Sequence, residues 1–465
     1  MKIVRLVLLS ALILAVLLAS HFLYGQTPAA TAPKDPGARA GSVNAGNALA
    51  GLTASQLEYF QDGQARFNEV DAVQNGLGPT YNSNSCASCH AQPAVGGSSP
   101  SVADYPNLGP NPQVAAANAG GATNHVPSFI TADGPVREAR FPFAVGPNGG
   151  VTRTPDGGVH ALFTITGRSD ANGCSLAQPN FAAMQQANNV IFRIPTPTYG
   201  AGLIEMIPDA TIINNMKANA ALKALLGISG HTNTSGNDGS VTRFGWKAQN
   251  KSLEIFTGEA YNVEMGVTNE LFPNERGAAT GACASNPTPE DTTNFDQSGS
   301  QIPSDVVSFS AFMRFLGPPT PSSAGISTNP SATSIANGKA LFSQIHCDAC
   351  HTATLSTGPS KIAALSHQTA ALYSDLLVHN MGSGLADNVS QGAAGPDEFR
   401  TAPLWGLGQR IFFLHDGRSG PANGGLVHAI AQHSSSGSEA NRVIALYNAL
   451  SASQKQDLLN FLRSL

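Results

Sequence analysis

Apolar residues recur at helical spacing in several short stretches of this chain, separated by long polar segments. The clearest begins after Thr53, which can cap a helix whose apolar positions Leu57, Phe60 and Phe67 fall on one face. Thr53 therefore predicts the start of a helix that leads toward residue 86. The same criterion predicts helices over 209–226, which Gly227 would end, and over 252–263, 336–345, 425–432 and 453–465.

Extended structure is predicted in only two places. Residues 160–166 and 190–194 alternate in polarity or are β-branched, as short strands are. Most of the remaining chain is rich in Gly, Pro, Asn and Ser, with 48 glycines and 30 prolines in 465 residues. We therefore expect a mainly helical protein with long irregular loop insertions and a few short β-strands.

The first 50 residues differ in composition from the rest. Met1–Arg5 is short and basic, 6–18 is apolar except for Ser10, and a polar, Ala- and Pro-rich stretch follows. This pattern predicts a signal peptide over 1–25, or an uncleaved N-terminal anchor, and then a flexible linker over 26–50. In both cases the folded part would be periplasmic or otherwise extracytoplasmic.

Two pentapeptides determine the chemistry we expect. Cys86-Ala-Ser-Cys89-His90 and Cys347-Asp-Ala-Cys350-His351 both have the C-x-x-C-H pattern of covalent haem c attachment. The two thiols would bond to the haem vinyl groups, and His90 and His351 would each be a proximal iron ligand. The alternative is a redox dithiol or half of a zinc site, but two copies in an exported chain favour two covalently bound haem c groups.

The motifs suggest two cytochrome-c-like haem domains. A Pro-, Ser- and Thr-rich stretch over 318–334 is the best linker, so we predict an N-terminal domain with insertions over 51–317 and a C-terminal domain over 335–465. Of six cysteines, Cys174 and Cys283 lie outside the motifs. In an oxidising compartment they are expected to form a disulfide, the alternative being two separate buried thiols.

Charge gives a weaker signal. Charged residues make up 12% of the chain and the net charge is −5. This balance gives no reason to expect nucleic acid as a partner.

Several segments together resemble the bacterial dihaem oxidoreductase family, which is related to the dihaem cytochrome c peroxidases and to MauG. They are 82–97, 189–213, 243–248, 262–268, 398–408 and 413–418. The resemblance implies an oxidoreductase in which electrons pass from a six-coordinate C-terminal haem to an open N-terminal haem. It also implies a redox partner protein, such as a small cytochrome or copper protein, and a small-molecule oxidant or an organic substrate.

The resemblance assigns the sixth ligand of the His351 haem to His433, where the peroxidases use methionine. Met381, which is followed by glycine, and His428, on the same predicted helix as His433, are the alternatives. A haem with two histidine ligands has a lower potential than one with histidine and methionine.

By the same resemblance, Trp246 is the relay between the haems and Glu264 is the distal acid that moves protons during O–O cleavage. The alternatives are a core tryptophan and a surface or calcium-neighbouring glutamate. The peroxidases have glutamine eight residues before that glutamate, and Phe256 stands here. The substitution predicts a more apolar distal pocket and favours oxygenase-like or substrate-oxidising chemistry over simple peroxide reduction.

His415 corresponds to a histidine beside the second haem, and Thr401 and Pro403 lie where relatives bind Ca²⁺ between domains. Two other functions remain open. An electron-transfer cytochrome would have two six-coordinate irons and no substrate pocket, and a maturation factor would oxidise side chains of a partner protein.

Overall fold

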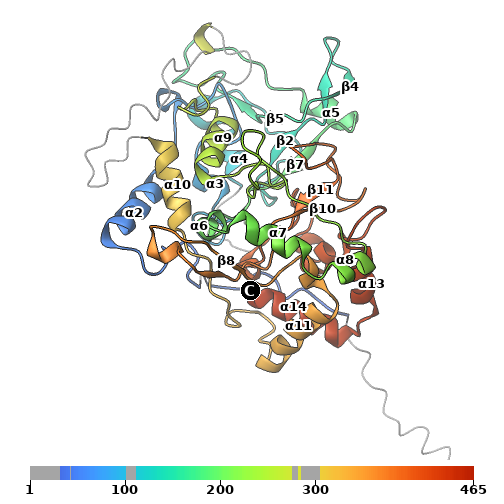
Figure 1. The fold of residues 1–465 in the computed structure, drawn as a ribbon. Helices are drawn as coiled ribbons and strands as arrows, with labels where there is room; N and C mark the ends of the chain where they lie inside the picture. The colour runs from blue at the N-terminus through green and yellow to red at the C-terminus, as the bar shows by residue number, and fades with distance from the viewer. Residues whose placement is uncertain (1–31, 42, 101–110, 275–280, 284–303) are drawn as a thin grey trace, which may run out of the picture.

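The computed structural model describes residues 32–41, 43–100, 111–274, 281–283 and 304–465. In this part of the chain helices predominate and the strands are short, as the sequence predicts (Figure 1). The expected signal peptide or anchor over 1–25 lies outside the described residues. None of the helices in the described ranges has the length and apolar character needed to cross a bilayer.

The N-terminal unit is built on two helices that lie side by side (Figure 1). Helix α2 (Ala54–Asn68) begins at Thr53, whose hydroxyl accepts from the Gln56 amide while Gln56 caps in return. It packs along α10 (Asp305–Phe315) at Gly63, where a Cβ would lie 2.3 Å from the Ser308 carbonyl oxygen. Glycine is therefore required for this close approach.

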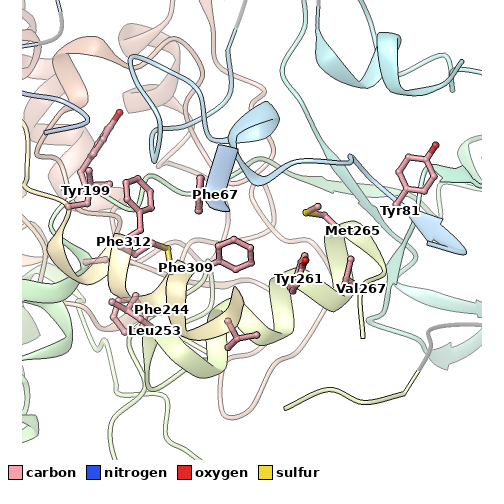
Figure 2. Close-up of a cluster of buried hydrophobic side chains, with 14 of the residues drawn as sticks. Phe67, Tyr81, Tyr199, Phe244, Leu253, Tyr261, Met265, Val267, Phe309 and Phe312 are labelled. Carbon is pink, nitrogen blue, oxygen red and sulfur yellow. The ribbon is translucent and has the colours of Figure 1, made fainter. Parts of the chain in front are cut away.

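Aromatic side chains fill the core beside this helix pair (Figure 2). The Phe67 ring lies 4.9 Å from that of Phe312 and 6.1 Å from that of Phe309, while Tyr261 packs edge-on to Phe309 at 5.0 Å. Tyr261 belongs to α9 (Leu253–Met265), which Ser252 caps. Leu57, expected on the packing face of α2, is 40% exposed, so the buried stripe of this helix is narrower than predicted.

The C-terminal unit repeats this arrangement. Helix α11 (Ala332–Gln344) packs along α14 (Ala452–Ser464), and a Cβ on Gly338 would lie 2.0 Å from the Asp457 carbonyl oxygen. Phe342 follows Gly338 by four residues, as Phe67 follows Gly63, and it packs 5.6 Å from Phe461. Two units of the same kind are therefore built around two helix crossings.

Shorter helices complete the two units. Within the described residues they are α3 (Cys86–Cys89), α4 (Pro112–Ala116), α5 (Phe181–Gln186), α6 (Ala201–Glu205), α7 (Asp209–Lys217), α8 (Ala220–Leu226), α12 (Leu426–Ala431) and α13 (Asn441–Ala449). The single helix predicted over 209–226 is wrong, because Asn219 has φ 53° and separates α7 from α8. Asparagine tolerates this left-handed conformation better than most residues.

The strands form small antiparallel sheets. The largest described has three strands, with β2 (Glu138–Arg140) between β5 (Val159–His160) and β7 (Ile191–Arg193). The others are pairs: β1 (Thr80–Tyr81) with β6 (Phe163–Thr164), β3 (Phe143–Val145) with β4 (Val151–Pro155), β8 (Leu355–Ser356) with β9 (Thr369–Ala370), and β10 (Val378–Asn380) with β11 (Glu398–Arg400). The strands expected over 160–166 and 190–194 correspond to β5, β6 and β7.

Of the linker expected over 26–50, the structure describes residues 32–41 and 43–50, and these make specific contacts with the folded part of the chain. Asp35 forms an ion pair at 2.7 Å with Arg463 of α14, and both side chains are nearly buried. The Arg39 amide donates to the Gly408 carbonyl at 2.7 Å, and Ala48 bridges to Leu316. Apolar burial adds to these polar contacts, since Ala45 is buried in the core of the N-terminal unit and Ala48 and Leu49 pack against it.

Cys174 and Cys283 form a disulfide across a sequence separation of 109 residues. The prediction of this pairing is confirmed. The bond joins residue 174, in the loop between β6 and α5, to the segment that follows α9, so it cross-links two insertions of the N-terminal unit.

Candidate dihaem site

The first C-x-x-C-H motif faces a cavity of about 170 Å³ in the N-terminal unit. Cys86 and Cys89 lie at the two ends of α3, and both line the cavity together with His90. The His90 Nδ1 donates to the Gly97 carbonyl at 3.0 Å, and the Phe67 ring packs 5.9 Å from the imidazole. With Nδ1 engaged, Nε2 is left as the ligating nitrogen.

The second motif repeats this geometry beside a cavity of about 220 Å³. Cys347, Cys350 and His351 line it, and the His351 Nδ1 donates to the Tyr373 carbonyl at 3.0 Å. Phe342 of α11 lies 6.3 Å from the His351 ring, as Phe67 of α2 lies beside His90. In both units a phenylalanine ring and a backbone carbonyl thus orient the histidine of the motif.

His433 lines the cavity of His351 from the turn that follows α12. Its Nδ1 donates to the Ala429 carbonyl at 2.8 Å, which leaves Nε2 as its ligating atom. Met381 lines the same cavity. His428 is not among the residues that line it, and its Nδ1 lies 2.8 Å from the Ser419 hydroxyl. The geometry therefore favours His433 and Met381 over His428.

Burial keeps these imidazoles uncharged. It lowers the pKa of His90 and of His351 to about 4, and it also lowers the pKa of His433. Neutral imidazole is the form that binds a metal ion. The environment of each histidine thus suits ligation.

Trp246 lines both cavities, so the indole lies where the two sites meet. Its Nε1 donates to the Ile194 carbonyl at 2.8 Å, and the Ile194 amide donates to the His415 carbonyl at 2.8 Å. The His415 ring lies 6.4 Å from the indole and stacks on Phe399 at 4.2 Å. Burial lowers the pKa of His415 to about 4, so this aromatic group is neutral.

Glu264 and Phe256, both on α9, line the first cavity with His90. The lining of this cavity is mixed, and a distal pocket more apolar than in the peroxidases stays a prediction. Phe256, Phe309 and other apolar groups form one part of the wall. A polar part that the sequence did not reveal is contributed by Asn82, Gln113, Glu138, Arg140, Arg193 and Gln249.

His379, which lines the second cavity, has two carboxylate partners. Its Nε2 lies 3.0 Å from Asp375 Oδ2 and its Nδ1 lies 2.8 Å from Glu439 Oε2. Burial opposes protonation, but the neighbouring Cys350 and Asp375 raise the pKa of His379 well above its usual value. His379 thus lies buried between two carboxylates beside the second motif. Asp375 lies only four residues before His379, whereas Glu439 lies 60 residues after it, so the group of three is complete only in the folded chain.

The sequence of residues 151–465 matches the family model described as "Di-haem oxidoreductase, putative peroxidase". The match covers more than half of the chain. The chain belongs to this di-haem oxidoreductase family. The second C-x-x-C-H motif lies within the matched residues, and the first precedes them. The family implies two haem cofactors.

Solved structures show a more distant likeness. A MauG-like protein associated with microbial copper homeostasis is 17% identical, with 51% of this chain and 77% of that one covered and a TM-score of 0.28. The diheme peroxidase BthA from Burkholderia thailandensis E264 is 18% identical, with 48% and 65% covered and a TM-score of 0.28. Among curated proteins none matches the chain.

The residues of the second cavity fit a haem of this family. Arg400 and Arg410 both line it, and Nε and Nη2 of the buried Arg410 have no hydrogen-bond partner among the described residues. Burial lowers the pKa of both guanidinium groups to about 10, with a further contribution at Arg400 from the charge of Arg410. Two buried like charges, one of them with unused donors, suit the anionic propionates of a haem.

The calcium residues carried over from relatives are less clearly supported. Thr401 lines the second cavity, and Pro403 lines a smaller neighbouring one beside Trp405. Across the described ranges, one group of three His, Cys, Asp or Glu side chains is close enough to hold a metal ion, namely Cys350, Asp375 and His379. Because Cys350 belongs to the haem motif, we do not assign this group to a metal, and Ca²⁺ binding stays a prediction.

Proposed function

We propose that this member of the family is an exported dihaem c-type oxidoreductase of the peroxidase kind. In this proposal electrons pass between a six-coordinate C-terminal haem and an open N-terminal haem. The observation that carries it is Trp246, a single indole that lines both cavities. A small cytochrome or copper protein would supply the electrons, and the protein would lie outside the cytoplasm, as the N-terminal sequence predicts.

Each cofactor would be held by one motif. Cys86 and Cys89 would bind the first haem covalently and His90 its iron. Cys347, Cys350 and His351 would do the same for the second. Haem iron supplies one-electron redox chemistry and a coordination position for peroxide or dioxygen.

The two cavities differ in what they offer opposite the proximal histidine. The second contains His433, whose free Nε2 would complete a six-coordinate iron. Among the described residues that line the first, His90 is the one histidine, and Glu264 is available as an acid and base. Peroxide reduction to water consumes two electrons and two protons, and the carboxyl of Glu264 would be the group that transfers protons at the open side.

The remaining side chains orient and shield the site. Arg410 would hold the carboxylates of the second haem, and Phe256 and Phe309 exclude water from part of the first cavity. Arg400 is fixed by its Nε donating to the Gly245 carbonyl at 3.0 Å and by its amide donating to the Trp246 carbonyl at 2.8 Å. The indole is thus tied to a residue of the second cavity.

The test compares Trp246→Phe with Trp405→Phe, which removes the other tryptophan, a buried residue lining neither haem cavity. A pyridine haemochrome spectrum should first give two haems per chain in all three proteins. Peroxide-dependent oxidation of a reduced donor protein should then slow in Trp246→Phe and be retained in Trp405→Phe. Equal rates in both variants, or a wild-type protein that does not consume peroxide, would contradict the proposal.

A second candidate function rests on two methionines. Met265 and Met313 line the first cavity, and either thioether could complete that iron. Both irons would then be six-coordinate, and the protein would carry electrons without turning over a substrate. Cyanide binding separates the two functions, because an open iron binds it readily and an iron ligated by methionine resists it. Oxidation of an organic substrate would share the open site, and the polar part of the cavity wall allows it.

A further inference from the structure

Arg193, Lys247 and Asp387 form a buried cluster of charges. The Arg193 Nη2 donates to Asp387 Oδ2 at 2.7 Å, and the Lys247 Nζ lies 3.1 Å from Asp387 Oδ1. The side chains of Lys247 and Asp387 are 0% exposed, and that of Arg193 is 3% exposed. Charges this far from solvent are costly to bury, so each of them needs a partner inside the protein.

The cluster joins the walls of the two cavities. Arg193, on β7, lines the first cavity. Asp387 lies between β10 and β11, two residues after Leu385, which lines the second cavity. The Lys247 Nζ lies 4.1 Å from the ring centroid of Phe399, another residue of the second cavity. A carboxylate of the C-terminal unit therefore holds a side chain of the first cavity.

The charges within this cluster do not balance. Besides its contact with Asp387, the Lys247 Nζ donates at 2.9 Å to the Gly395 carbonyl and at 2.8 Å to the Glu398 carbonyl, and three acceptors suit an ammonium group. Burial lowers the pKa of Lys247 to about 8, so the ammonium form still predominates at neutral pH. One carboxylate therefore faces two cations, and one positive charge is left over.

The acids that line the first cavity do not supply the missing negative charge. Glu138 faces Arg193 in the register of β2 and β7, but its Oε1 accepts from the Arg140 Nε at 2.8 Å, and that ion pair is balanced in itself. The other two are Glu259 and Glu264. Among the described residues, the acid in ion-pair contact with Arg193 is Asp387.

The Arg193 guanidinium has a nitrogen available for a further anion. Its Nη1 donates to Gln391 Oε1 at 2.6 Å and its Nη2 to Asp387, whereas the buried Nε has no hydrogen-bond partner in the described part of the chain. A buried donor is costly unless a group in the cavity accepts from it. In the second cavity Arg410 likewise has a buried Nε without a partner. The carboxylate of a haem has the charge and the acceptor atoms that both arginines lack.

We propose that Arg193 binds a propionate carboxylate of the first haem and that Asp387, a positioning residue, acts through Arg193 on the potential of that haem. A propionate paired with Arg193 no longer stabilises ferric iron with its negative charge, so the pairing favours the ferrous state. Asp387 moderates this effect from the C-terminal unit. The inference rests on the proposed function only in assigning the first haem to the cavity of His90, and it does not require peroxide as a substrate.

The first experiment measures the reduction potentials of both haems in the holoprotein by spectroelectrochemical titration, after a pyridine haemochrome spectrum has shown two haems per chain. The high-spin and low-spin absorption bands separate the first haem from the second. Arg193→Gln should lower the reduction equilibrium constant of the first haem about tenfold, or about 59 mV for one electron, because the propionate loses its counter-charge. Asp387→Asn should raise the potential, because the positive charge of the cluster is then less compensated. A loosened fold would shift both variants in the same direction.

Arg168 and Asp170 provide the matched control. Their side chains pair at 2.8 Å, and Arg168 has a 5% exposed side chain but lines neither haem cavity. Arg168→Gln and Asp170→Asn should therefore leave both potentials unchanged. An unchanged first-haem potential in Arg193→Gln, or shifts of the same sign in Arg193→Gln and Asp387→Asn, would overturn the inference.

The second experiment detects the hydrogen bond itself and applies even if Arg193→Gln does not fold. Resonance Raman spectra of haem proteins contain a propionate bending band whose frequency depends on the hydrogen bonds to the carboxylate. Arg193→Lys keeps the charge but places one nitrogen where the guanidinium has three, so this band should shift, whereas Arg168→Lys should leave it in place. An unshifted band in Arg193→Lys would overturn the inference. If the band and the potentials shift as expected but the wild type does not consume peroxide, the proposed function fails while the propionate site stands.

Discussion

Asp71 is a buried acid whose removal should stabilise the protein in a pH-dependent way. It is 4% exposed, and the Tyr261 hydroxyl lies 3.3 Å from Asp71 and 3.1 Å from Asp305, joining two carboxyl groups in the core of the N-terminal unit. Burial, and then the charges of Glu69 and Asp305, raise the pKa of Asp71 from 3.8 to about 7.

The size of the effect follows from proton linkage. Below about pH 4 Asp71 is protonated in both the folded and the unfolded chain, and it contributes no pH dependence. Between about pH 4 and pH 7 the folded state alone keeps the proton, so stability falls as the pH rises. At about 1.4 kcal/mol for each pH unit, the loss reaches about 4 kcal/mol above pH 7.

Asp71→Asn should remove this loss, because an amide can accept from Tyr261 without becoming charged. The variant should match the wild type near pH 4 and exceed it by about 4 kcal/mol at pH 8. With an unfolding entropy of about 2.1 cal/mol/K per residue over 465 residues, this is an increase in Tm of about 4 °C if the chain unfolds as one unit.

The assay is thermal unfolding of the holoprotein at several pH values from 4 to 8, with Glu58→Gln on the exposed surface of α2 as the control. The decisive quantity is the difference in Tm between variant and wild type, in which other titrations cancel. A difference that is the same at pH 5 and pH 8, or a variant less stable than the wild type at pH 8, would refute the reasoning.

Three further predictions concern the haem ligand, the disulfide and the helix crossing. His433→Ala should convert one haem from low spin to high spin in the EPR spectrum, and the same change in Met381→Leu instead would transfer the ligand role to Met381. Cys174→Ser should remove the disulfide and lower the unfolding free energy by about 2–4 kcal/mol, whereas two alkylatable thiols in the native wild type would contradict this. Gly338→Ala should lower the free energy of unfolding by about 1–3 kcal/mol, because its Cβ would overlap a carbonyl oxygen of α14. Gly236→Ala, whose Cβ would meet no atom within 4 Å, is the control and should not lose this packing energy.

The parts of the fold that the sequence predicted are those with local signals. Thr53 and Ser252 cap helices because each hydroxyl accepts a hydrogen bond from a free amide of the first turn. That amide belongs to a residue only three positions further along the chain, so the signal is local. The Cys-x-x-Cys-His motifs are equally local. The break at Asn219 was missed because the Ala- and Leu-rich stretch that follows it favours helix, and neither glycine nor proline marks an interruption before Gly227.

The parts that were missed depend on contacts between distant segments. Glu138 lies on a strand of three residues with no hydrophobic alternation. Only in the folded chain does β2 bring it to the wall of the first cavity, which Glu264 also lines. Asp35 was assigned to a flexible linker because its partner, Arg463, is at the other end of the chain. A single sequence does not show which distant residues come into contact, so such pairs are recognised only in the folded chain.

The two units show how one local arrangement can support two different sites. In each, two helices cross at a glycine, a phenylalanine one turn later packs beside the histidine of the Cys-x-x-Cys-His motif, and the Nδ1 of that histidine donates to a backbone carbonyl. The two sites differ because different lengths of chain lie between the Cys-x-x-Cys-His motif and the last helix of each unit, which is α10 in the N-terminal unit and α14 in the C-terminal unit. In the C-terminal unit this chain is short and α12 leads to His433, a second imidazole. In the N-terminal unit it is long and includes β2, β7 and α9, which bring a pair of carboxyls and two arginines to the cavity. The long insertion is thus the part of the chain that makes the N-terminal site a candidate for proton-coupled chemistry, while the compact unit has the features of an electron-transfer site.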